Sequence, residues 1–278
     1  MIKIHILECG EVGVDPAVPD RSVSGSPIAY TGLFRSSRRR IWIPVKAFLI
    51  EHPKGRILVD TGWDSAVRTH PIRSLTFPLW LTSKPRLPNG TAVDEQLAAL
   101  GLSAKDLDYV IMTHMDIDHD SGLRLVRSAK KILVSEEEWA ALHSGQVRYA
   151  RRPWHGIPLT RMPLSDNPAA PFGKSWDVWG DGSITVILTP GHTKGSVTIR
   201  ISGENGFILI VGDTGYNQNS WEYQQLPGPV YDKETMKKSL AWVQEMHRDP
   251  NCIAVLASHD PEEKRTEIKI TEDLKNDN

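Results

Sequence analysis

Short apolar segments rich in β-branched residues recur along the whole chain, and Gly, Pro or Asp bounds most of them. Segments with this composition and these boundaries are typical of β-strands. The pattern therefore predicts strands at Ile2–Leu7, Ile41–Ile50, Arg56–Val59, Tyr109–Thr113, Lys131–Val134, Ile184–Leu188, Val197–Ile201, Phe207–Val211 and Ile253–Ala257.

Helical patterns lie between some of these strands. Val93–Leu100 is one such segment, and Glu136–His143 is a second, with Ser135 as its N-cap and Glu138 completing a capping box. The strongest is Asp232–Arg248, because its apolar residues recur every three or four positions. Since helices interrupt the strands without strict alternation, we expect a layered α/β fold with mixed sheets, formed by a single domain over residues 1–278.

Two long stretches, residues 63–90 and 148–182, are rich in Pro, Trp and Arg and show no clear period. Long irregular segments in a compact domain often cover a functional site. We expect these two stretches to be loops that cover a substrate pocket, although their aromatic residues could instead pack the loops against the domain or form a dimer contact.

Composition narrows the class of protein. The 33 basic and 34 acidic residues give a net charge of −1, so we expect no nucleic-acid partner and no membrane-surface partner. Two cysteines are too few for a disulfide scaffold or a thiolate zinc site. The longest apolar run, Phe207–Val211, is far shorter than a membrane span. Residues 1–8 alternate like a strand and contain no signal-peptide core, so we expect a cytoplasmic protein.

Candidate metal ligands gather directly after the strand predicted at Tyr109–Thr113. His114, Asp116, Asp118 and His119 fall within six residues of one another. Residues two apart in extended chain face the same side, and the turn that follows can bring the last two side chains to the same point. Burying these groups without partners would be costly, and a bound cation is the economical partner.

Three more strands end in the same way. His192 follows Ile184–Leu188, Asp213 follows Phe207–Val211, and His259 follows Ile253–Ala257. We expect these side chains to converge with the first group at one rim of a sheet.

The order of these residues resembles the metallo-β-lactamase superfamily, whose pattern is His-x-His-x-Asp-His followed by a distant His, Asp and His. The resemblance covers nearly the whole chain, from Leu58–Gly62 to His259. It implies a four-layer αββα sandwich with two divalent metal ions, zinc being expected, and places Asp60 behind a ligand histidine. By position, one metal would be held by His114, Asp116 and His192, the other by Asp118, His119 and His259, and Asp213 would bridge them.

Within that superfamily the chain is most similar to the N-acyl-homoserine lactonases, which place a Tyr three residues after the bridging Asp, here Tyr216. The likeness implies a quorum-quenching hydrolase that opens a small-molecule lactone or ester by attack of a metal-bridging hydroxide. Tyr216 would donate a hydrogen bond to the oxyanion, and Asp118 would relay a proton to the leaving group. Whether the protein is a homodimer is left open.

One departure from the family pattern leaves alternatives open. Asp116 stands where the family has its second His, and a carboxylate there favours iron or manganese more than an imidazole does. An iron-type oxidoreductase of the same fold, a nuclease-like phosphodiesterase and a non-catalytic relative are the alternative functions. A phosphodiesterase needs a basic groove, for which the sequence offers little besides the run Arg35–Arg40 and Arg148, Arg151 and Arg152.

Overall fold

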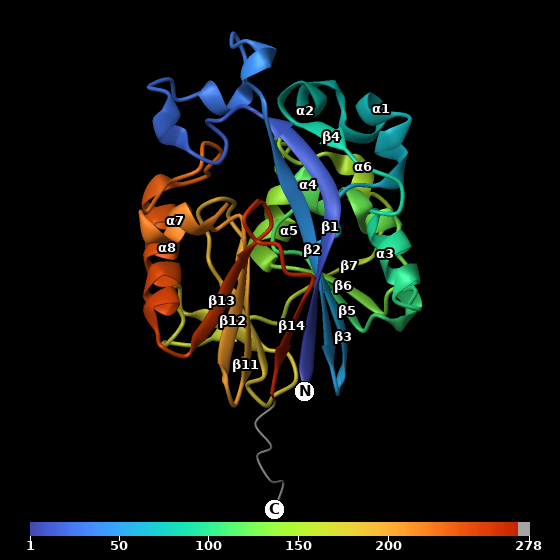
Figure 1. The fold of residues 1–278 in the computed structure, drawn as a ribbon, viewed down its shortest axis with the longest axis vertical. Helices are drawn as coiled ribbons and strands as arrows, with labels where there is room; N and C mark the ends of the chain where they lie inside the picture. The colour runs from blue at the N-terminus through green and yellow to red at the C-terminus, as the bar shows by residue number, and fades with distance from the viewer. Residues whose placement is uncertain (272–278) are drawn as a thin grey trace, which may run out of the picture.

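Two β-sheets pack face to face in the computed structural model, which describes residues 1–271 (Figure 1). The first sheet has the order β14-β1-β2-β3-β5-β6-β7, with β4 paired to β1 beside this path, and the second has the order β13-β12-β11-β10-β9-β8. The strands of the first sheet are β1 (Ile2–Val14), β2 (Ile41–His52), β3 (Gly55–Val59), β4 (Lys84–Arg86), β5 (Tyr109–Ile111), β6 (Lys131–Val134), β7 (Leu159–Arg161) and β14 (Glu267–Ile270). Those of the second are β8 (Ser165–Asp166), β9 (Lys174–Asp177), β10 (Ile184–Leu188), β11 (Val197–Gly203), β12 (Gly206–Gly212) and β13 (Cys252–Ala257).

Helices cover the outer faces of both sheets (Figure 1). They are α1 (Pro71–Leu75), α2 (Phe77–Thr82), α3 (Val93–Ala99), α4 (Ile117–Asp120), α5 (Glu136–Leu142), α6 (Arg151–Trp154), α7 (Gln218–Glu222) and α8 (Lys233–Arg248). None of the helices within residues 1–271 is long and apolar enough to cross a membrane.

Alternating apolar positions build three separate cores. In β1, Ile2, Ile4 and Ile6 face the second sheet, whereas Leu7 and Cys9 pack under the helices of the first sheet. The third core lies between β12 and the helices α7 and α8. Because each sheet buries both of its faces, the expected four-layer αββα arrangement in a single domain is confirmed.

Strand direction brings the chain ends of several strands to one edge. β3, β5 and β6 run parallel to one another, so the segment after β5 leaves the first sheet at their shared carboxyl end. In the second sheet β11 is antiparallel to both β10 and β12, and β13 is parallel to β12. The segments that follow β10, β12 and β13 therefore also emerge together, which is where α/β sheets commonly bind ligands.

The nine predicted strands are present, most with ends shifted by one or two residues. The first strand is longer than the predicted Ile2–Leu7. β1 continues to Val14 through an irregularity between Glu8 and Glu11, which breaks the alternation of side chains. Gly10 lies there with φ of +88°, and a Cβ would come within 2.3 Å of the Arg86 carbonyl oxygen.

The predicted capping box at α5 is half wrong. The Ser135 hydroxyl accepts from the Glu138 backbone N–H at 3.1 Å, as an N-cap does. The Glu138 carboxylate does not return to Ser135, because it accepts the backbone N–H of Met115 at 2.9 Å and of Gly195 at 3.2 Å. This residue thus links two of the site-bearing loops.

The two stretches expected to be irregular contain short elements. Residues 63–90 hold α1, α2 and β4, and residues 148–182 hold α6 and the strands β7, β8 and β9. In the second stretch Trp176 and Trp179 pack against Tyr109 between the sheets, with ring centroids 5.7 Å and 5.5 Å away. A role in covering a substrate stays a prediction for both stretches.

Candidate metal centre

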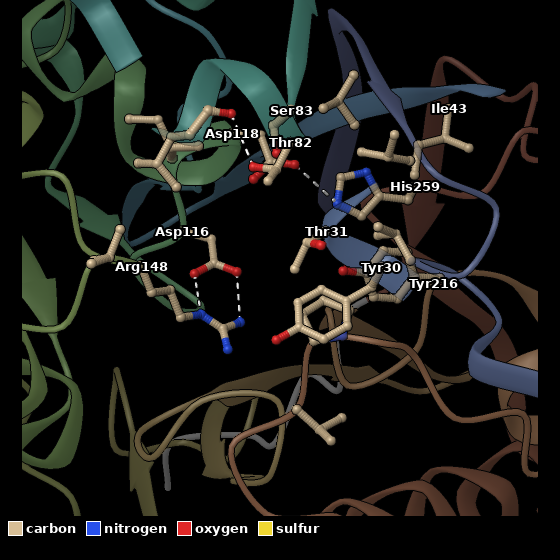
Figure 2. Close-up of a pocket in the computed structure, with 18 residues that line it drawn as sticks. Tyr30, Thr31, Ile43, Thr82, Ser83, Asp116, Asp118, Arg148, Tyr216 and His259 are labelled. Carbon is tan, nitrogen blue, oxygen red and sulfur yellow. Dashed lines mark hydrogen bonds and ion pairs between the residues drawn. The ribbon is translucent and has the colours of Figure 1, made fainter. Parts of the chain in front are cut away.

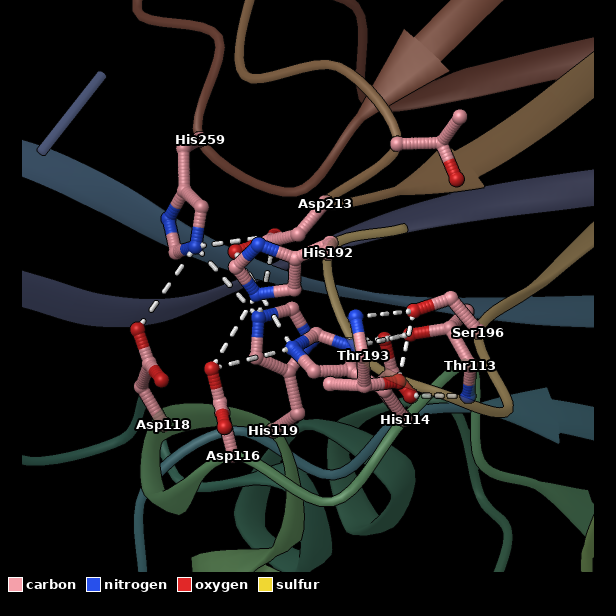
Figure 3. A network of polar contacts seen from close by, with 12 residues as sticks. Thr113, His114, Asp116, Asp118, His119, His192, Thr193, Ser196, Asp213 and His259 are labelled. Carbon is pink, nitrogen blue, oxygen red and sulfur yellow. Dashed lines mark hydrogen bonds and ion pairs between the residues drawn. The ribbon is translucent and has the colours of Figure 1, made fainter. Parts of the chain in front are cut away.

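Seven side chains from four separate loops converge at the edge where the strands end (Figure 3). Their ligand-type atoms form overlapping groups in which all atoms lie within 4.8 Å of one another. We call His114, Asp116 and His192 the first cluster, and Asp118, His119 and His259 the second cluster; Asp213 lies between the two. The structure therefore brings together all seven residues singled out from the sequence; that they bind metal stays a prediction.

Asp60 fixes the orientation of two of the histidines. The Asp60 carboxylate accepts from the Thr113 hydroxyl at 2.7 Å and from Nδ1 of His119 at 2.8 Å. Since the Thr113 proton is used in this way, Nδ1 of His114 donates to the Thr113 oxygen at 3.0 Å. Both imidazoles therefore use Nδ1 as a hydrogen-bond donor and direct Nε2 toward the centre.

His259 is oriented in the same way by a backbone group. Its Nδ1 donates to the carbonyl oxygen of Pro44 in β2 at 2.7 Å. Its Nε2 then faces Nε2 of His119 at 3.3 Å, and Asp213 Oδ1 lies 3.2 Å from each of these nitrogens. Two imidazole nitrogens and one carboxylate oxygen thus converge on a single point.

This arrangement fits a divalent cation in the second cluster. Zinc at about 2.0–2.1 Å from four tetrahedral ligands requires ligand separations of about 3.3–3.4 Å. The separations above are 3.2–3.3 Å, and Asp118 Oδ2 lies 3.5 Å from His259 Nε2. Within the described residues Asp213 Oδ1 has no hydrogen-bond partner, which a buried carboxylate oxygen rarely tolerates.

The electrostatic field at His119 also favours a cation. Burial by itself lowers the pKa of this imidazole, but the charges of Asp213 and Asp60 outweigh burial and raise the pKa well above its usual value. The same field stabilises a divalent cation, which competes with the proton for Nε2.

The first cluster has similar spacing but a different environment. Nε2 of His192 lies 3.1 Å from Asp116 Oδ2 and 3.3 Å from Asp213 Oδ2, and Nε2 of His114 lies 3.5 Å from Asp116 Oδ2. A fourth residue, Arg148, occupies this cluster and satisfies part of it.

Arg148 was not identified as a site residue from the sequence. Its Nε and Nη2 donate to the two oxygens of Asp116, as the paired dashed lines in Figure 2 show. Nη2 also lies 2.6 Å from His192 Nε2, and Nη1 donates to the His192 carbonyl oxygen at 2.9 Å. Thirty-two residues separate Arg148 from Asp116, and no local pattern links them.

Charges explain how this contact is held. Burial opposes the guanidinium charge, but Asp116 outweighs burial and raises the pKa of Arg148 above its usual value. Burial, followed by the charge of Arg148, lowers the pKa of His192 to about 4. His192 is therefore neutral near pH 7, so its unprotonated nitrogen accepts the N–H of Arg148.

A cavity of about 380 Å³ opens beside the centre (Figure 2). Its polar lining consists of Tyr30, Thr31, Thr82, Ser83, Asp116, Asp118, Arg148, Tyr216 and His259. Its apolar lining consists of Val12, Val14, Val18, Ile43, Leu79, Ile117, Val147, Pro229 and Val230. The sequence did not indicate that β1, β2 and the segments near Tyr30 and Val230 would line this cavity, because their apolar residues look like ordinary core residues.

Tyr216 lies where the cavity meets the centre. It is 3% exposed, and its ring stacks on that of His259 at a centroid distance of 4.9 Å. Burial, together with the charge of Asp213, raises the pKa of Tyr216 well above its usual value, so its hydroxyl remains a donor at any ordinary pH.

Other polar residues considered from the sequence lie elsewhere. The histidines outside the clusters are His5, His52, His70, His143, His155 and His247. In the run Arg35–Arg40, Arg35 pairs with Asp15 at 2.6 Å, and Arg40 donates to carbonyl oxygens of Gly13 and Thr82. The side chains of these two arginines thus make hydrogen bonds within the protein.

The chain is similar in sequence to known proteins over most of its length. Residues 40–259 match the family described as the metallo-beta-lactamase superfamily. The N-acyl homoserine lactonase AttM of Rhizobium radiobacter is 28% identical over 225 residues, which cover 79% of this chain and 83% of that protein. The N-acyl homoserine lactonase AiiB of Agrobacterium fabrum is 26% identical over 287 residues, covering 97% and 98%.

A solved structure shares the fold. An N-acyl homoserine lactone hydrolase, with the product N-hexanoyl-L-homoserine bound at its catalytic metal center, superposes with a TM-score of 0.76 at 20% identity and with 96% of each chain covered. Since the family match spans most of the sequence and the sandwich is shared, the chain belongs to the metallo-beta-lactamase superfamily.

Proposed function

We propose that this protein is a metal-dependent hydrolase that opens lactone esters of the N-acyl-homoserine-lactone type. The observation that carries the proposal is the continuity between the second cluster and the cavity. His259 and Asp118 belong both to the second cluster and to the cavity lining, and Tyr216 of the lining stacks on His259, so a bound ester can reach these groups. The lactonases that this chain resembles in sequence support the same class of substrate.

The second cluster, together with Asp213, would hold a catalytic cation. A divalent cation bound there supplies Lewis acidity and a water of lowered pKa near neutral pH. His119 and His259 direct Nε2 toward the cation site, and their orientation is fixed by Asp60 and by the Pro44 carbonyl. These partners prevent the imidazoles from rotating and maintain the site before the cation arrives.

Two residues of the chain would act directly on the substrate. The Tyr216 hydroxyl, buried and protonated, donates a hydrogen bond to the oxygen that becomes negative when the ester carbonyl is attacked. Asp118 lies at the edge of the cavity with 16% of its side chain exposed. One of its oxygens faces His259, and the other can take up a proton and pass it to the leaving alkoxide.

The apolar walls would bind the acyl chain of the substrate. Val12, Val14 and Ile43 form one wall from β1 and β2. Leu79 from α2 and Val230 from the segment before α8 add to it. Burying one methylene group contributes about 0.8 kcal/mol. Of the two predicted covering stretches, 63–90 contributes Leu79, Thr82 and Ser83, whereas 148–182 contributes Arg148.

A substrate panel with metal removal tests the proposal. Protein loaded with zinc, manganese or iron is assayed with N-acyl homoserine lactones of increasing chain length and with a phosphodiester. We expect lactone opening that disappears after chelation and returns on adding metal, with KM falling as the chain lengthens. In Ile43→Ala this dependence on chain length should weaken. A metal-loaded protein that opens no lactone, or that prefers the phosphodiester, would contradict the proposal.

A further inference from the structure

We propose that Arg148 takes the place of the first metal ion, so that each chain binds one divalent cation, in the second cluster. The inference rests on the proposed metal-dependent function, but it concerns the number of cations and not the substrate. Three properties of the first cluster carry it: the use of its lone pairs, its charge, and the way Arg148 is held.

The guanidinium uses the lone pairs that a metal would need. A neutral imidazole has one lone pair, and on His192 the Nε2 lone pair faces Nη2 of Arg148 at 2.6 Å. The same Nη2 donates to Asp116 Oδ2 at 2.6 Å, the oxygen that lies nearest to His192 and His114. A metal in the first cluster would have to displace Arg148 from both atoms.

The guanidinium also supplies the first cluster with positive charge. It forms a bidentate ion pair with Asp116, the carboxylate that a cation in this cluster would need. A divalent cation placed there would be repelled by the guanidinium, so the cation and Arg148 compete for the same carboxylate.

Arg148 is held in place by more than its ion pair. Nη1 donates to the His192 carbonyl oxygen at 2.9 Å, and the side chain is 22% exposed. Its contacts with Asp116 and His192 use four of the five guanidinium N–H groups. A bidentate pair of this kind is among the strongest polar contacts in proteins. Displacing Arg148 from the first cluster therefore costs a large free energy.

Asp116 is the residue that allows Arg148 to occupy the place of a metal ion. An imidazole at position 116 would offer the guanidinium one acceptor, whereas the carboxylate offers two in the geometry of a fork. The carboxylate and Arg148 therefore form a unit: the arginine supplies positive charge and N–H donors beside the cavity, but it cannot bind water as a Lewis acid.

Counting bound cations tests the inference without any activity measurement. The metal-free full-length protein is titrated with Co²⁺, bound metal is measured by mass spectrometry after desalting, and anomalous diffraction locates the ion. We expect one equivalent, at the second cluster. In Arg148→Ala and in Arg148→Met, which keeps an unbranched side chain, we expect the count to rise to two. Arg151→Ala removes an exposed arginine close in the sequence and should leave it at one.

Each outcome decides between the two arrangements. Two tightly bound equivalents in the wild-type protein would overturn the inference, as would a single equivalent at the first cluster. A count that stays at one in a folded Arg148 variant would also overturn it, because Arg148 would then not be what keeps the second ion out. A chain that binds one cation and opens no lactone would contradict the proposed function alone, and one that opens lactones with two cations would contradict this inference alone.

Discussion

Asp60 and His119 are joined by a hydrogen bond of 2.8 Å between two fully buried side chains. Asp60 has a φ of +57°, a conformation that is strained for a residue other than glycine. Its other oxygen accepts the Thr113 backbone N–H at 2.8 Å, so the carboxylate links the segment that follows β5 to the imidazole of His119. The strained backbone places this carboxylate where both donors converge.

Replacing Asp60 by Asn should weaken metal binding. An amide keeps the size of the side chain but faces one of these donors with an NH₂ group, so His119 loses its fixed orientation. We expect metal affinity to fall about 10–100-fold. Competition with a chromogenic chelator measures it. Asp64→Asn serves as the control, because Asp64 caps a neighbouring surface turn through the Ala66 N–H; equal losses in both variants would remove Asp60 from this role.

Replacing Tyr216 by Phe should lower turnover while the fold and the metal content remain. The hydroxyl is the one group lost, and removal of a single oxyanion donor typically lowers kcat about 10²–10³-fold. Steady-state kinetics on a lactone gives kcat and KM separately. Tyr231→Phe, at a side chain that is 52% exposed, should leave both unchanged. An unchanged kcat for Tyr216→Phe on every lactone tried would exclude this tyrosine from the reaction.

Much of the candidate site could be predicted from the sequence because each ligand-type residue follows an apolar strand. His192, Asp213 and His259 come within four residues of the ends of β10, β12 and β13, and parallel strand ends share one edge. A local pattern, an apolar strand followed by a polar residue, is therefore enough to predict that these side chains meet at one edge of the sheets.

The parts that could not be predicted depend on long-range contacts. Arg148 lies next to Trp-rich and Arg-rich sequence that resembles an exposed loop. Its pairing with Asp116 follows from the tertiary contact between α4, which begins directly after Asp116, and α6, which begins at Arg151. The cavity wall from Val12 and Val14 was missed because the irregularity after Glu8 interrupts the alternation that marks a strand.

Replacing Glu138 by Gln should destabilise the protein. The carboxylate is fully buried and accepts the N–H groups of Met115 and Gly195, one on each loop of the first cluster. A glutamine can accept one of them but turns an NH₂ toward the other, which leaves a buried donor without a partner. We expect a loss of about 2–3 kcal/mol in the free energy of unfolding, measured with urea.

The neighbouring Glu136 provides the matched control for that measurement. It lies two residues earlier on the same helix, with 55% of its side chain exposed. Glu136→Gln should change the free energy of unfolding by less than about 1 kcal/mol, because exposed ion pairs contribute little. Similar losses in the two variants would mean that the buried bridge of Glu138 does not stabilise the loops.

The pair of Arg68 and Glu95 should make part of the stability depend on pH. Arg68 donates to both oxygens of Glu95 at 2.8 Å and 2.6 Å, and this contact lowers the pKa of Glu95 from 4.5 to about 2. A carboxylate whose folded pKa is depressed stabilises the protein above its unfolded pKa and loses that contribution as the pH falls through the folded value. Because the side chain is 33% exposed, screening reduces the contribution to about 1 kcal/mol.

Glu95→Gln should therefore be less stable than the wild type near pH 7, and the difference should shrink as the pH falls below about 4.5. Urea unfolding at a series of pH values between about 3 and 7 measures both curves. Glu245 is an exposed carboxylate of α8, so the free energy of unfolding of Glu245→Gln should be close to that of the wild type at every pH. A difference between wild type and Glu95→Gln that stays constant over this range would have to come from packing or from the Ala92 N–H contact at 2.9 Å, and not from the ionised carboxylate held by Arg68.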